Sequence, residues 1–269
     1  PALILSSCRP VEALNASGHP TGKRNILRQS LVVFQFSLSI ILIISSLVVY
    51  RQFRTMRTAK LGYTTDNVIL LPARSDAGKS YEILKNQLQS NPAILGVTAQ
   101  GYEFAKMSYH SKGNWDWEGR KPDHQIDMVV RGVEFEFFET LNIPLKYGRF
   151  FSKEIERDTD EAVILNEEAV SAMGITDPVG KWFSYSADKR RRIVGVIRSP
   201  HFLSFHHQLE PEVFFIDKIA ESSGSSLIMV RIRSDRIDET LSFIRETWKQ
   251  NVPGAPFEFH FLDDTYASL

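Results

Sequence analysis

Three histidines that lie close together in the sequence are the residues best suited to metal chemistry. His201, His206 and His207 stand in the segment HFLSFHH. A metal site needs a defined geometry and usually a third or fourth ligand, and Glu210 is the only carboxylate close by. A loop with exposed imidazoles explains the segment better, so we assign no metal ligand here.

A glycine-rich segment invites a phosphate-binding interpretation. Gly174–Lys181 reads GITDPVGK and ends in the Gly-Lys pair of a phosphate loop. The Ser or Thr that must follow the lysine is replaced by Trp182, and the segment follows a predicted helix and contains a proline. Without the metal-binding hydroxyl, the segment is a poor nucleotide site.

The other nucleophiles and carboxylates also lack a catalytic arrangement. The single cysteine, Cys8, lies outside the large domain predicted below, and one cysteine excludes both a disulfide framework and a multi-cysteine zinc site. No GxSxG serine elbow occurs in the sequence. The acidic runs Glu154–Glu161 and Asp263-Asp264 are typical of solvated faces.

Basic and aromatic clusters have similarly simple explanations. Lys189–Arg192 reads KRRR, which we interpret as a charged turn rather than a nucleic-acid patch. Trp115 and Trp117 are expected to fill a core rather than line a ligand groove. We therefore predict no catalytic, cofactor-binding or metal-binding residue and no cofactor.

One uncharged segment decides the class of the protein. Leu31–Tyr50 contains twenty residues without a charge. As a helix it spans about 30 Å, the thickness of a bilayer's hydrocarbon core. Its only polar side chains apart from Tyr50 are Gln35, Ser37, Ser39, Ser45 and Ser46, which we expect to face neighbouring helices. A buried core helix is usually shorter, and a signal peptide has a shorter apolar region and a cleavage site.

The charges around this segment leave its orientation open. Four basic residues precede the span and four follow it, so the positive-inside rule gives a tie. Arg51, Arg54 and Arg57 recur at helical spacing, which predicts that the helix continues beyond the membrane as a stalk to about Lys60.

Charge is distributed unevenly along the 269 residues. Residues 1–65 contain eight Lys/Arg and one acid, whereas residues 66–269 contain 24 Lys/Arg and 31 Asp/Glu. An acidic domain lacks the clustered cations that phosphate contacts need, so nucleic acid is excluded as a partner. The chain begins with proline rather than methionine, and we expect it to be part of a longer protein.

The rest of the chain alternates strand and helix patterns. A polar loop is predicted over 15–25, before the uncharged segment. Further along the chain, helices are predicted over 79–89, 135–141, 167–173 (with Gly174 as its stop) and 236–250. Strands are predicted over 67–71 (closed by Pro72), 94–99, 125–133, 162–165, 191–197, 212–216, 227–232 and 257–262. The interleaving predicts a mixed α+β domain of two lobes that begins with a β-α-β unit.

Six motifs in one order carry a resemblance to a known family. They are Leu5-Ser6-Ser7 with Arg9–Leu14, the apolar segment with its Arg28-x-x-Leu-Val-x-x-Gln-Phe start, Leu141–Leu145 with Gly148–Phe151, Ala162–Glu167, Gly174–Lys181, and Arg192–Ile197. In these motifs the chain resembles the MacB/FtsX-like permeases of ABC transporters, particularly the double-repeat permeases of Bacteroidetes. One departure is Arg198–Phe202 (RSPHF), where the family often has KDFHF.

The resemblance implies an architecture and a location. Residues 1–28 would be a cytoplasmic junction segment, 29–61 the transmembrane helix and stalk, and 62–269 a two-lobed extracytoplasmic domain of the MacB periplasmic core type. The chain would sit in the cytoplasmic (inner) membrane with the large domain in the periplasm. In this view the Gly174–Lys181 segment is a structural turn.

The resemblance also implies a function and partners. The chain would be a permease subunit and not an enzyme, and a separate cytoplasmic ABC ATPase subunit would hydrolyse ATP to drive export or mechanotransmission. Its partners would be that ATPase, a second permease copy, membrane lipid, and a periplasmic protein or exported substrate. Peptides, lipoproteins, antibiotics and mechanical signalling all remain open as the cargo or task. The alternatives are a membrane-anchored ligand-binding sensor and, less favoured, a membrane-tethered enzyme.

Overall fold

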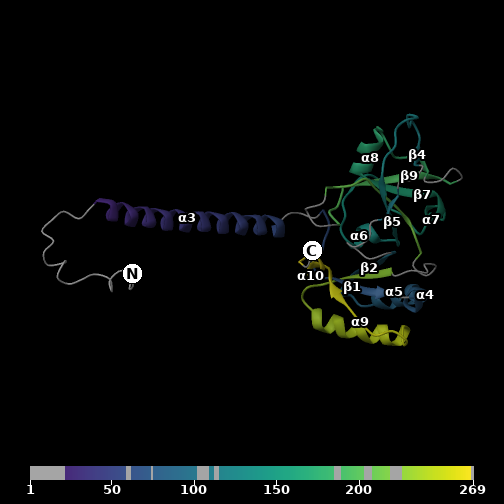
Figure 1. Ribbon diagram of the computed structural model, residues 1–269. Helices are drawn as coiled ribbons and strands as arrows, with labels where there is room; N and C mark the ends of the chain where they lie inside the picture. Colours follow the sequence, from purple (N-terminus) through teal and green to yellow (C-terminus); the bar gives the residue numbers. More distant parts are fainter. Residues whose placement is uncertain are drawn as a thin grey trace, which may run out of the picture. The chain divides into compact units, whose positions relative to one another are not determined.

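Two compact units make up the chain, and each is described by itself. The computed structural model describes residues 22–58, 62–73, 75–101, 109–111, 115–184, 189–202, 208–218 and 226–267 (Figure 1). The units are Pro1–Ala59 and Lys60–Leu269. We call the second unit the core domain.

The first unit is dominated by one long helix. Helix α3 runs without interruption from Gly22 to Thr58, 37 residues or about 55 Å. The predicted helix and its continuation beyond Tyr50 are confirmed as far as Thr58. The expected loop at 15–25 is wrong for Gly22–Asn25, which are helical, because Lys23 and Arg24 are good helix formers and an existing helix propagates easily into them.

The first lobe of the core domain is a four-stranded antiparallel sheet. Its order is β12 (His260–Phe261), β1 (Val68–Ala73), β11 (Ser226–Ile232) and β2 (Ile94–Gly101). Helices α4 (Ser75–Lys79) and α5 (Tyr81–Gln89) connect β1 to β2, and α9 (Ile237–Asn251) connects β11 to β12. This is a ferredoxin-like βαββαβ arrangement, in which β11 separates the parallel strands β1 and β2.

The second lobe is inserted between β2 and β11. Its main sheet runs β5 (Met128–Val133), β10 (Glu212–Ile216), β7 (Ala162–Asn166), β9 (Arg190–Ile197), β8 (Trp182–Ser184) and β4 (Asp116–Trp117). Strand β3 (Tyr109–Ser111) pairs with β5, and β6 (Leu145–Gly148) pairs with β9. Its helices are α6 (Phe137–Thr140), α7 (Asp158–Glu161) and α8 (Glu167–Met173).

The two lobes share a hydrophobic core. Strands β2 and β5 are neighbours in one continuous sheet, and among the described residues they pair at Gln100 and Val133, with a further hydrogen bond from the Glu134 N–H to the Ala99 carbonyl oxygen. One buried cluster also contains residues of both lobes, namely Val68, Leu70 and Met229 from the first and Phe137, Phe138, Phe202 and Phe214 from the second. Because these side chains pack in a single cluster, parting the lobes would expose apolar surface to water.

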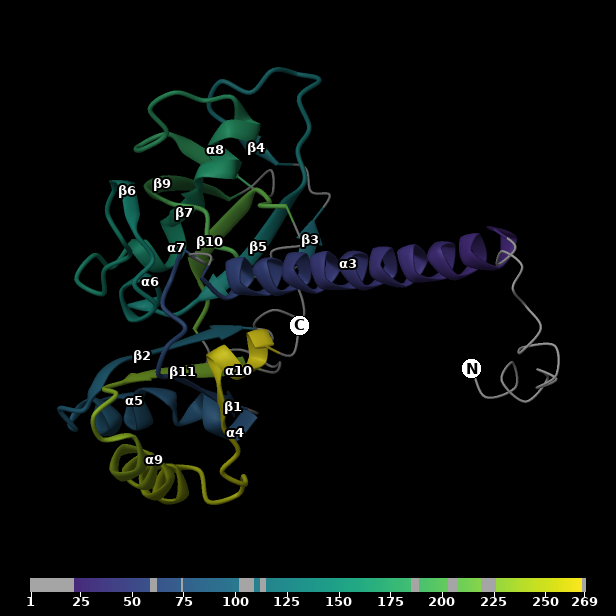
Figure 2. The same cartoon turned by 90° about the vertical axis from the view of Figure 1, so that its left-hand side faces the viewer.

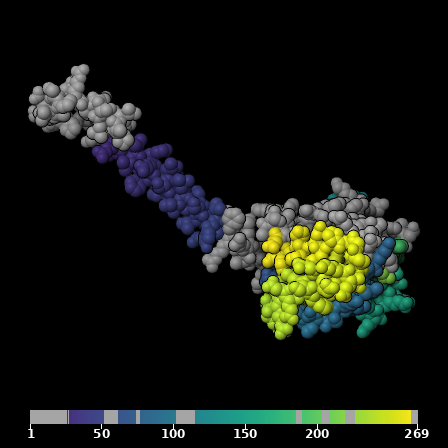
Figure 3. Space-filling view, turned by 90° about the horizontal axis from the view of Figure 1, so that it is seen from below, coloured from purple at the N-terminus to yellow at the C-terminus, as the bar shows by residue number. Residues whose placement is uncertain are grey.

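Two further clusters cover the outer faces of the sheets. Helices α5 and α9 pack on the face of the first lobe that points away from the second (Figures 1 and 2), with Leu84, Ile244 and Trp248 buried there. Seen from below, α9 and the C-terminal segment form a closed surface over this lobe (Figure 3). Helix α8 covers the second lobe with Ala169 and Met173. The predicted mixed α+β fold with two lobes is confirmed.

Two predicted strands differ from the structure at their ends. Strand β1 does not close at Pro72 but continues to Ala73, because β12 pairs only with Ile69 and Leu70 and no neighbour needs an N–H from Pro72 on that side. The strand predicted over 257–262 is only His260–Phe261. Leu262 instead starts helix α10 (Leu262–Ala267), with acidic Asp263 and Asp264 in its first turn.

Candidate functional site

Helix α3 has the length and surface of a membrane span. Residues Arg28–Arg51 have a mean hydropathy of 2.5, and none of that stretch is buried within the structure. Its large apolar side chains are exposed along the whole stretch, including Phe34, Ile41 and Leu47. An apolar surface of this extent fits a lipid environment and not water.

The polar side chains of this helix fall partly on one stripe. At 100° per residue, Gln35, Ser39 and Ser46 lie within about 40° of one another around the helix axis. The Ser39 hydroxyl donates to the Gln35 carbonyl oxygen over 2.9 Å, which satisfies it inside the helix. Such a stripe suits contact with a neighbouring membrane helix.

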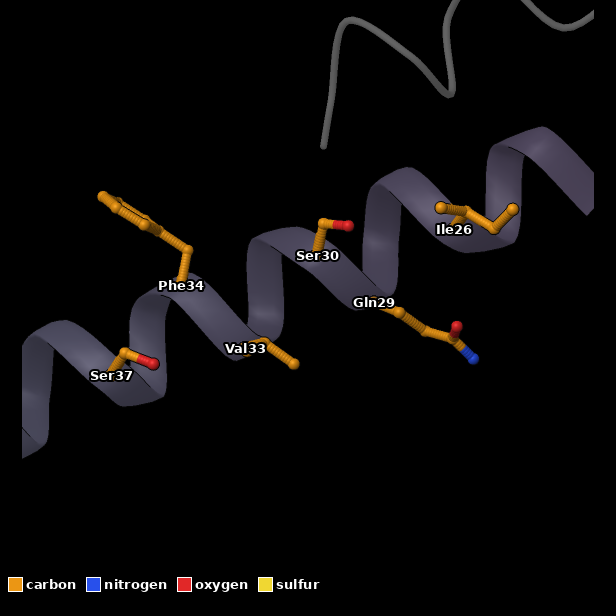
Figure 4. A pocket seen from close by; sticks show the side chains of 6 residues that line it. All are labelled: Ile26, Gln29, Ser30, Val33, Phe34 and Ser37. Carbon is orange, nitrogen blue, oxygen red and sulfur yellow. The ribbon is translucent and has the colours of Figure 1, made fainter.

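A shallow hollow lies on α3, but its lining does not converge on a ligand site. It is lined by Ile26, Gln29, Ser30, Val33, Phe34 and Ser37. Figure 4 shows Phe34 and Gln29 pointing to different sides of the helix. The hollow therefore reflects spacing between neighbouring side chains along one helix.

The segment that enters the core domain is fastened to the second lobe. We call Gly62–Thr65 the docking segment. The Thr64 N–H donates to the Leu141 carbonyl oxygen over 2.7 Å, and the Asn142 side-chain amide donates to the Thr64 hydroxyl over 3.0 Å. Both partners follow helix α6, so the chain contacts the second lobe before it enters β1 of the first.

Gly62 fits closely against a loop of the second lobe. Its φ of 84° lies in the left-handed region. A Cβ placed there would lie 3.3 Å from the Pro200 Cα and 3.4 Å from the Ser199 carbonyl oxygen. Both the backbone conformation and the close approach therefore favour glycine.

Aromatic packing completes the contact. The ring centroids of Tyr63 and Phe202 lie 5.2 Å apart, and Tyr63 packs against the shared core. Phe202 is buried. Arg131 of strand β5 lies over its ring, with 4.5 Å between the guanidinium carbon and the ring centroid. We call Leu141–Asn142 together with Ser199–Phe202 the seat of the docking segment.

A buried ion pair lies directly behind the seat. Arg131 donates from Nε and from one terminal nitrogen to Glu212 Oε1, at 3.0 and 2.7 Å. Both side chains are almost fully buried. Burial raises the pKa of the Glu212 carboxyl above its usual value, although the charge and hydrogen bonds of Arg131 act in the opposite direction.

A second ion pair spans the two lobes. Lys85 of α5 is buried and pairs with Glu136, which precedes α6 with a φ of 60°. Lys85 also lies 5.8 Å from the ring centroid of Tyr81. Burial, followed by the charges of Glu134, Glu82 and Glu136, raises the pKa of Tyr81 well above its usual value, so this phenol stays neutral.

The predicted histidine cluster falls mostly outside the described residues. His201 is half-buried within the seat, whereas His206 and His207 belong to 203–207, which the structure does not describe. Within the described residues, no three His, Cys, Asp or Glu side chains gather as metal ligands. Cys8 also lies outside the described residues, and the expectation of no metal, cofactor or catalytic residue stays a prediction.

The segment Gly174–Lys181 is a turn between α8 and β8. Gly174 ends α8 with a φ of 64° while its N–H donates to the Ser171 carbonyl oxygen, as predicted for a helix stop. The Lys181 ammonium donates to the Thr176 carbonyl oxygen over 2.5 Å. The lysine is thus used within the turn, in line with the structural interpretation.

Two predicted surface features are wrong in part. Lys189–Arg192 is not a charged turn, because Arg190–Arg192 begin strand β9 and Arg191 is buried over the Phe215 ring. Within Glu154–Glu161, Asp158 is buried and accepts two hydrogen bonds from Arg149, at 2.5 and 2.7 Å. In both cases a charge is buried because a partner group lies opposite it.

The predictions for Trp115, Trp117 and the C-terminal acidic pair agree with the structure. Both tryptophans are buried in the core under α8, and Trp115 stacks on Phe183 at 5.7 Å. Asp263 and Asp264 are exposed.

No local sequence pattern predicts the seat. The positive φ of Gly62 and that of Asn142 within the LNIPL motif are set by contacts between distant residues. The segment Arg198–Phe202 (RSPHF), which departs from the family pattern, contributes Pro200 and Phe202 to the seat. A glycine followed by Tyr-Thr was the local signal, but its partners are distant in the sequence.

Comparisons with known proteins agree with this architecture. The family model described as the MacB-like periplasmic core domain matches residues 31–244. No curated protein matches the chain.

Solved structures give likeness at low identity. The periplasmic region of MacB from Actinobacillus actinomycetemcomitans has a TM-score of 0.53 at 16% identity, covering 80% of this chain and 97% of that one. The extracellular domain of the ABC-type transporter YknZ from Gram-positive bacteria has a TM-score of 0.49 at 16% identity, covering 72% and 98%. The first likeness supports the same fold.

Proposed function

Because the chain belongs to the family of MacB-like periplasmic core domains of ABC transporter permeases, we propose that it transmits movement across the membrane. A separate cytoplasmic ABC ATPase subunit hydrolyses ATP. The permease passes the resulting movement to its core domain, which acts there on an exported substrate or a partner protein. The chain itself carries out no covalent chemistry.

The observation that carries this proposal is the uninterrupted helix α3. At about 55 Å it exceeds the roughly 30 Å hydrocarbon core by several turns. Its backbone is hydrogen-bonded throughout, which is the requirement for crossing lipid. A continuous helix displaces its far end when its near end moves, which a flexible linker does not.

The proposed membrane arrangement follows from the same helix. Residues 1–28 form the cytoplasmic junction, 29–61 the span and stalk, and 62–269 the periplasmic domain at the inner membrane. Family membership supports this direction, since charge alone leaves a tie.

The stripe of Gln35, Ser39 and Ser46 supports contact with other membrane helices, and a second permease copy is the proposed partner there. In lipid, polar side chains gain little by facing hydrocarbon and gain hydrogen bonds by facing another helix. In this proposal one end of α3 faces the cytoplasmic ATPase, and the other end leads to the core domain in the periplasm.

Purification from membranes tests the proposal. The full-length protein is extracted in mild detergent, and the proteins bound in stoichiometric amount are identified. We expect an ABC ATPase with a GxxxxGK[ST] motif and ATP hydrolysis by the purified complex. A kinase-like signalling partner instead of an ATPase would support the sensor alternative and contradict the permease.

A further inference from the structure

We propose that the docking segment is the point at which movement of the membrane helix enters the core domain, and that it enters through the second lobe. This inference rests on the proposed function and adds the residues that receive the movement. It assigns a coupling role to Tyr63, Thr64 and Asn142, to which the proposed function alone gives no task.

The first step of the argument is the order of contacts along the chain. The described part of α3 ends at Thr58, and the docking segment begins only four residues later. Thr64 bonds to Leu141 and Asn142 of the second lobe before Val68 starts the first strand of the first lobe. A pull on the chain at Gly62 therefore acts on the second lobe first.

The second step is the strength of the attachment. Three contacts hold two successive residues of the docking segment: a backbone and a side-chain hydrogen bond at Thr64 and an aromatic pair at Tyr63. Gly62 adds a close backbone approach to Pro200. A segment held at successive residues has little freedom to absorb movement as slack.

The third step is what lies behind the seat. Phe202 is backed by Phe137 at 6.2 Å, Phe214 at 6.3 Å and the Arg131 guanidinium. Arg131 is fixed by the buried Glu212 on the neighbouring strand. Force on the Phe202 ring is thus received by a packed, ion-paired core and not by a flexible loop.

The last step is how the whole domain responds. Phe202 and Leu141 belong to the same buried cluster as Val68 and Met229 of the first lobe. The Lys85–Glu136 ion pair adds a polar link between the lobes. The domain therefore moves as one body once the seat is displaced.

The test uses the full permease with its ATPase in lipid nanodiscs. Cys8 and every other cysteine of the full permease and its ATPase are replaced by serine, and a spin label is attached at exposed Glu154 through Glu154→Cys. Pulsed electron paramagnetic resonance then measures the distance between labels on two permease copies, without nucleotide and after trapping with ATP and vanadate.

Two variants weaken the docking segment in different ways. Tyr63→Ala removes the ring that faces Phe202. Asn142→Gly removes the amide that bonds Thr64 and retains the freedom that a φ of 52° requires. We expect each variant to reduce the ATP-driven distance change to less than half of the wild-type change.

Matched controls separate coupling from folding. Tyr63→Phe keeps the ring that packs on Phe202 and should retain more of the distance change than Tyr63→Ala. Tyr147→Ala removes an exposed tyrosine from β6 and should leave the full distance change intact. Urea unfolding of each variant confirms that the core domain remains folded.

The outcomes distinguish the two proposals. An ATP-driven change in the wild type that both weakened variants retain in full would overturn the docking inference and leave the permease function standing. No ATP-driven change in a hydrolysing wild-type complex would contradict the proposed function itself.

Discussion

The rings of Tyr63 and Phe202 lie 5.2 Å apart, although 139 positions of sequence separate them. Tyr63 stands at the entrance to the core domain, and Phe202 follows strand β9 of the second lobe. The contact brings the end of the membrane-linked segment onto the core that both lobes share.

The shared core predicts that the two lobes unfold together. Phe214 is fully buried in that cluster, so Phe214→Ala should cost about 3–5 kcal/mol. Amide exchange of β11 and of β7, followed in urea on the full chain, should become rapid at the same denaturant concentration.

Phe214→Ala should lower the urea concentration at which the amides of β11 and β7 lose protection by the same amount for both strands. Ile83→Ala, which truncates an exposed side chain on α5, serves as the control and should change stability by less than about 0.5 kcal/mol. Loss of protection in one lobe while the other stays protected would show that the lobes are independent.

A pair of glycines separates backbone strain from steric clash. Gly148 and Gly119 both have positive φ, 77° and 88°. A Cβ on Gly148 would lie 2.2 Å from the Val194 carbonyl oxygen, whereas a Cβ on Gly119 meets nothing within 4 Å.

Gly148→Ala and Gly119→Ala should each lower the free energy of unfolding by about 1 kcal/mol, because a residue with a Cβ is strained in the left-handed region. Gly148→Ala should lose roughly 1–3 kcal/mol more, because backbone β9 must shift away from the new methyl group. Chemical denaturation measures both values, and equal losses would mean that β6 does not approach β9 as closely as described.

The Asp158–Arg149 pair predicts a contribution to acid stability. Burial alone would raise the pKa of Asp158, but hydrogen bonds from Arg149 and from the Ser152 N–H outweigh it and lower that pKa. The folded state therefore favours the carboxylate. Its stabilisation is present above the unfolded-state pKa of about 4 and is lost as the pH falls through the lower folded-state pKa.

Arg149→Met should remove most of this dependence. We expect the variant to lose about 2 kcal/mol at pH 7 and to show a flatter stability profile below pH 4 than the wild type. Lys153→Met, at an exposed lysine of the same loop, should keep the wild-type profile. An unchanged acid profile in Arg149→Met would contradict a role for the pair.

Much of the fold could be predicted from local patterns. Helix α8 and strand β10 have the predicted bounds, because Asn166 caps the helix at its start, Gly174 ends it, and Glu212–Ile216 is a compact apolar run. Helix α9 lies within one residue of the predicted range 236–250, and it buries Ile244 and Trp248. The resemblance to MacB-like permeases is confirmed by the family match.

The features that were missed depend on contacts between distant residues. No local pattern shows that Asp158 meets Arg149 or that Arg191 lies over Phe215. The position of β11 between β1 and β2 requires a strand that arrives after the inserted lobe. The docking segment likewise becomes visible only when Thr64 and Asn142 are placed side by side.

The central claim is that helix α3 carries movement from the ATPase to the core domain, and a break in that helix tests it. Val49→Pro removes a backbone hydrogen bond and places the proline ring against the preceding turn, which destabilises the helix by about 3 kcal/mol. Val49→Ala changes the side chain at the same position and keeps the helix.

The most direct measurement compares ATP hydrolysis and the ATP-driven distance between Glu154 labels in complexes of both variants. We predict that Val49→Pro hydrolyses ATP within about twofold of the Val49→Ala control, as expected if the ATPase is a separate subunit, but loses the distance change. A Val49→Pro complex that keeps both hydrolysis and the full distance change would contradict transmission through α3.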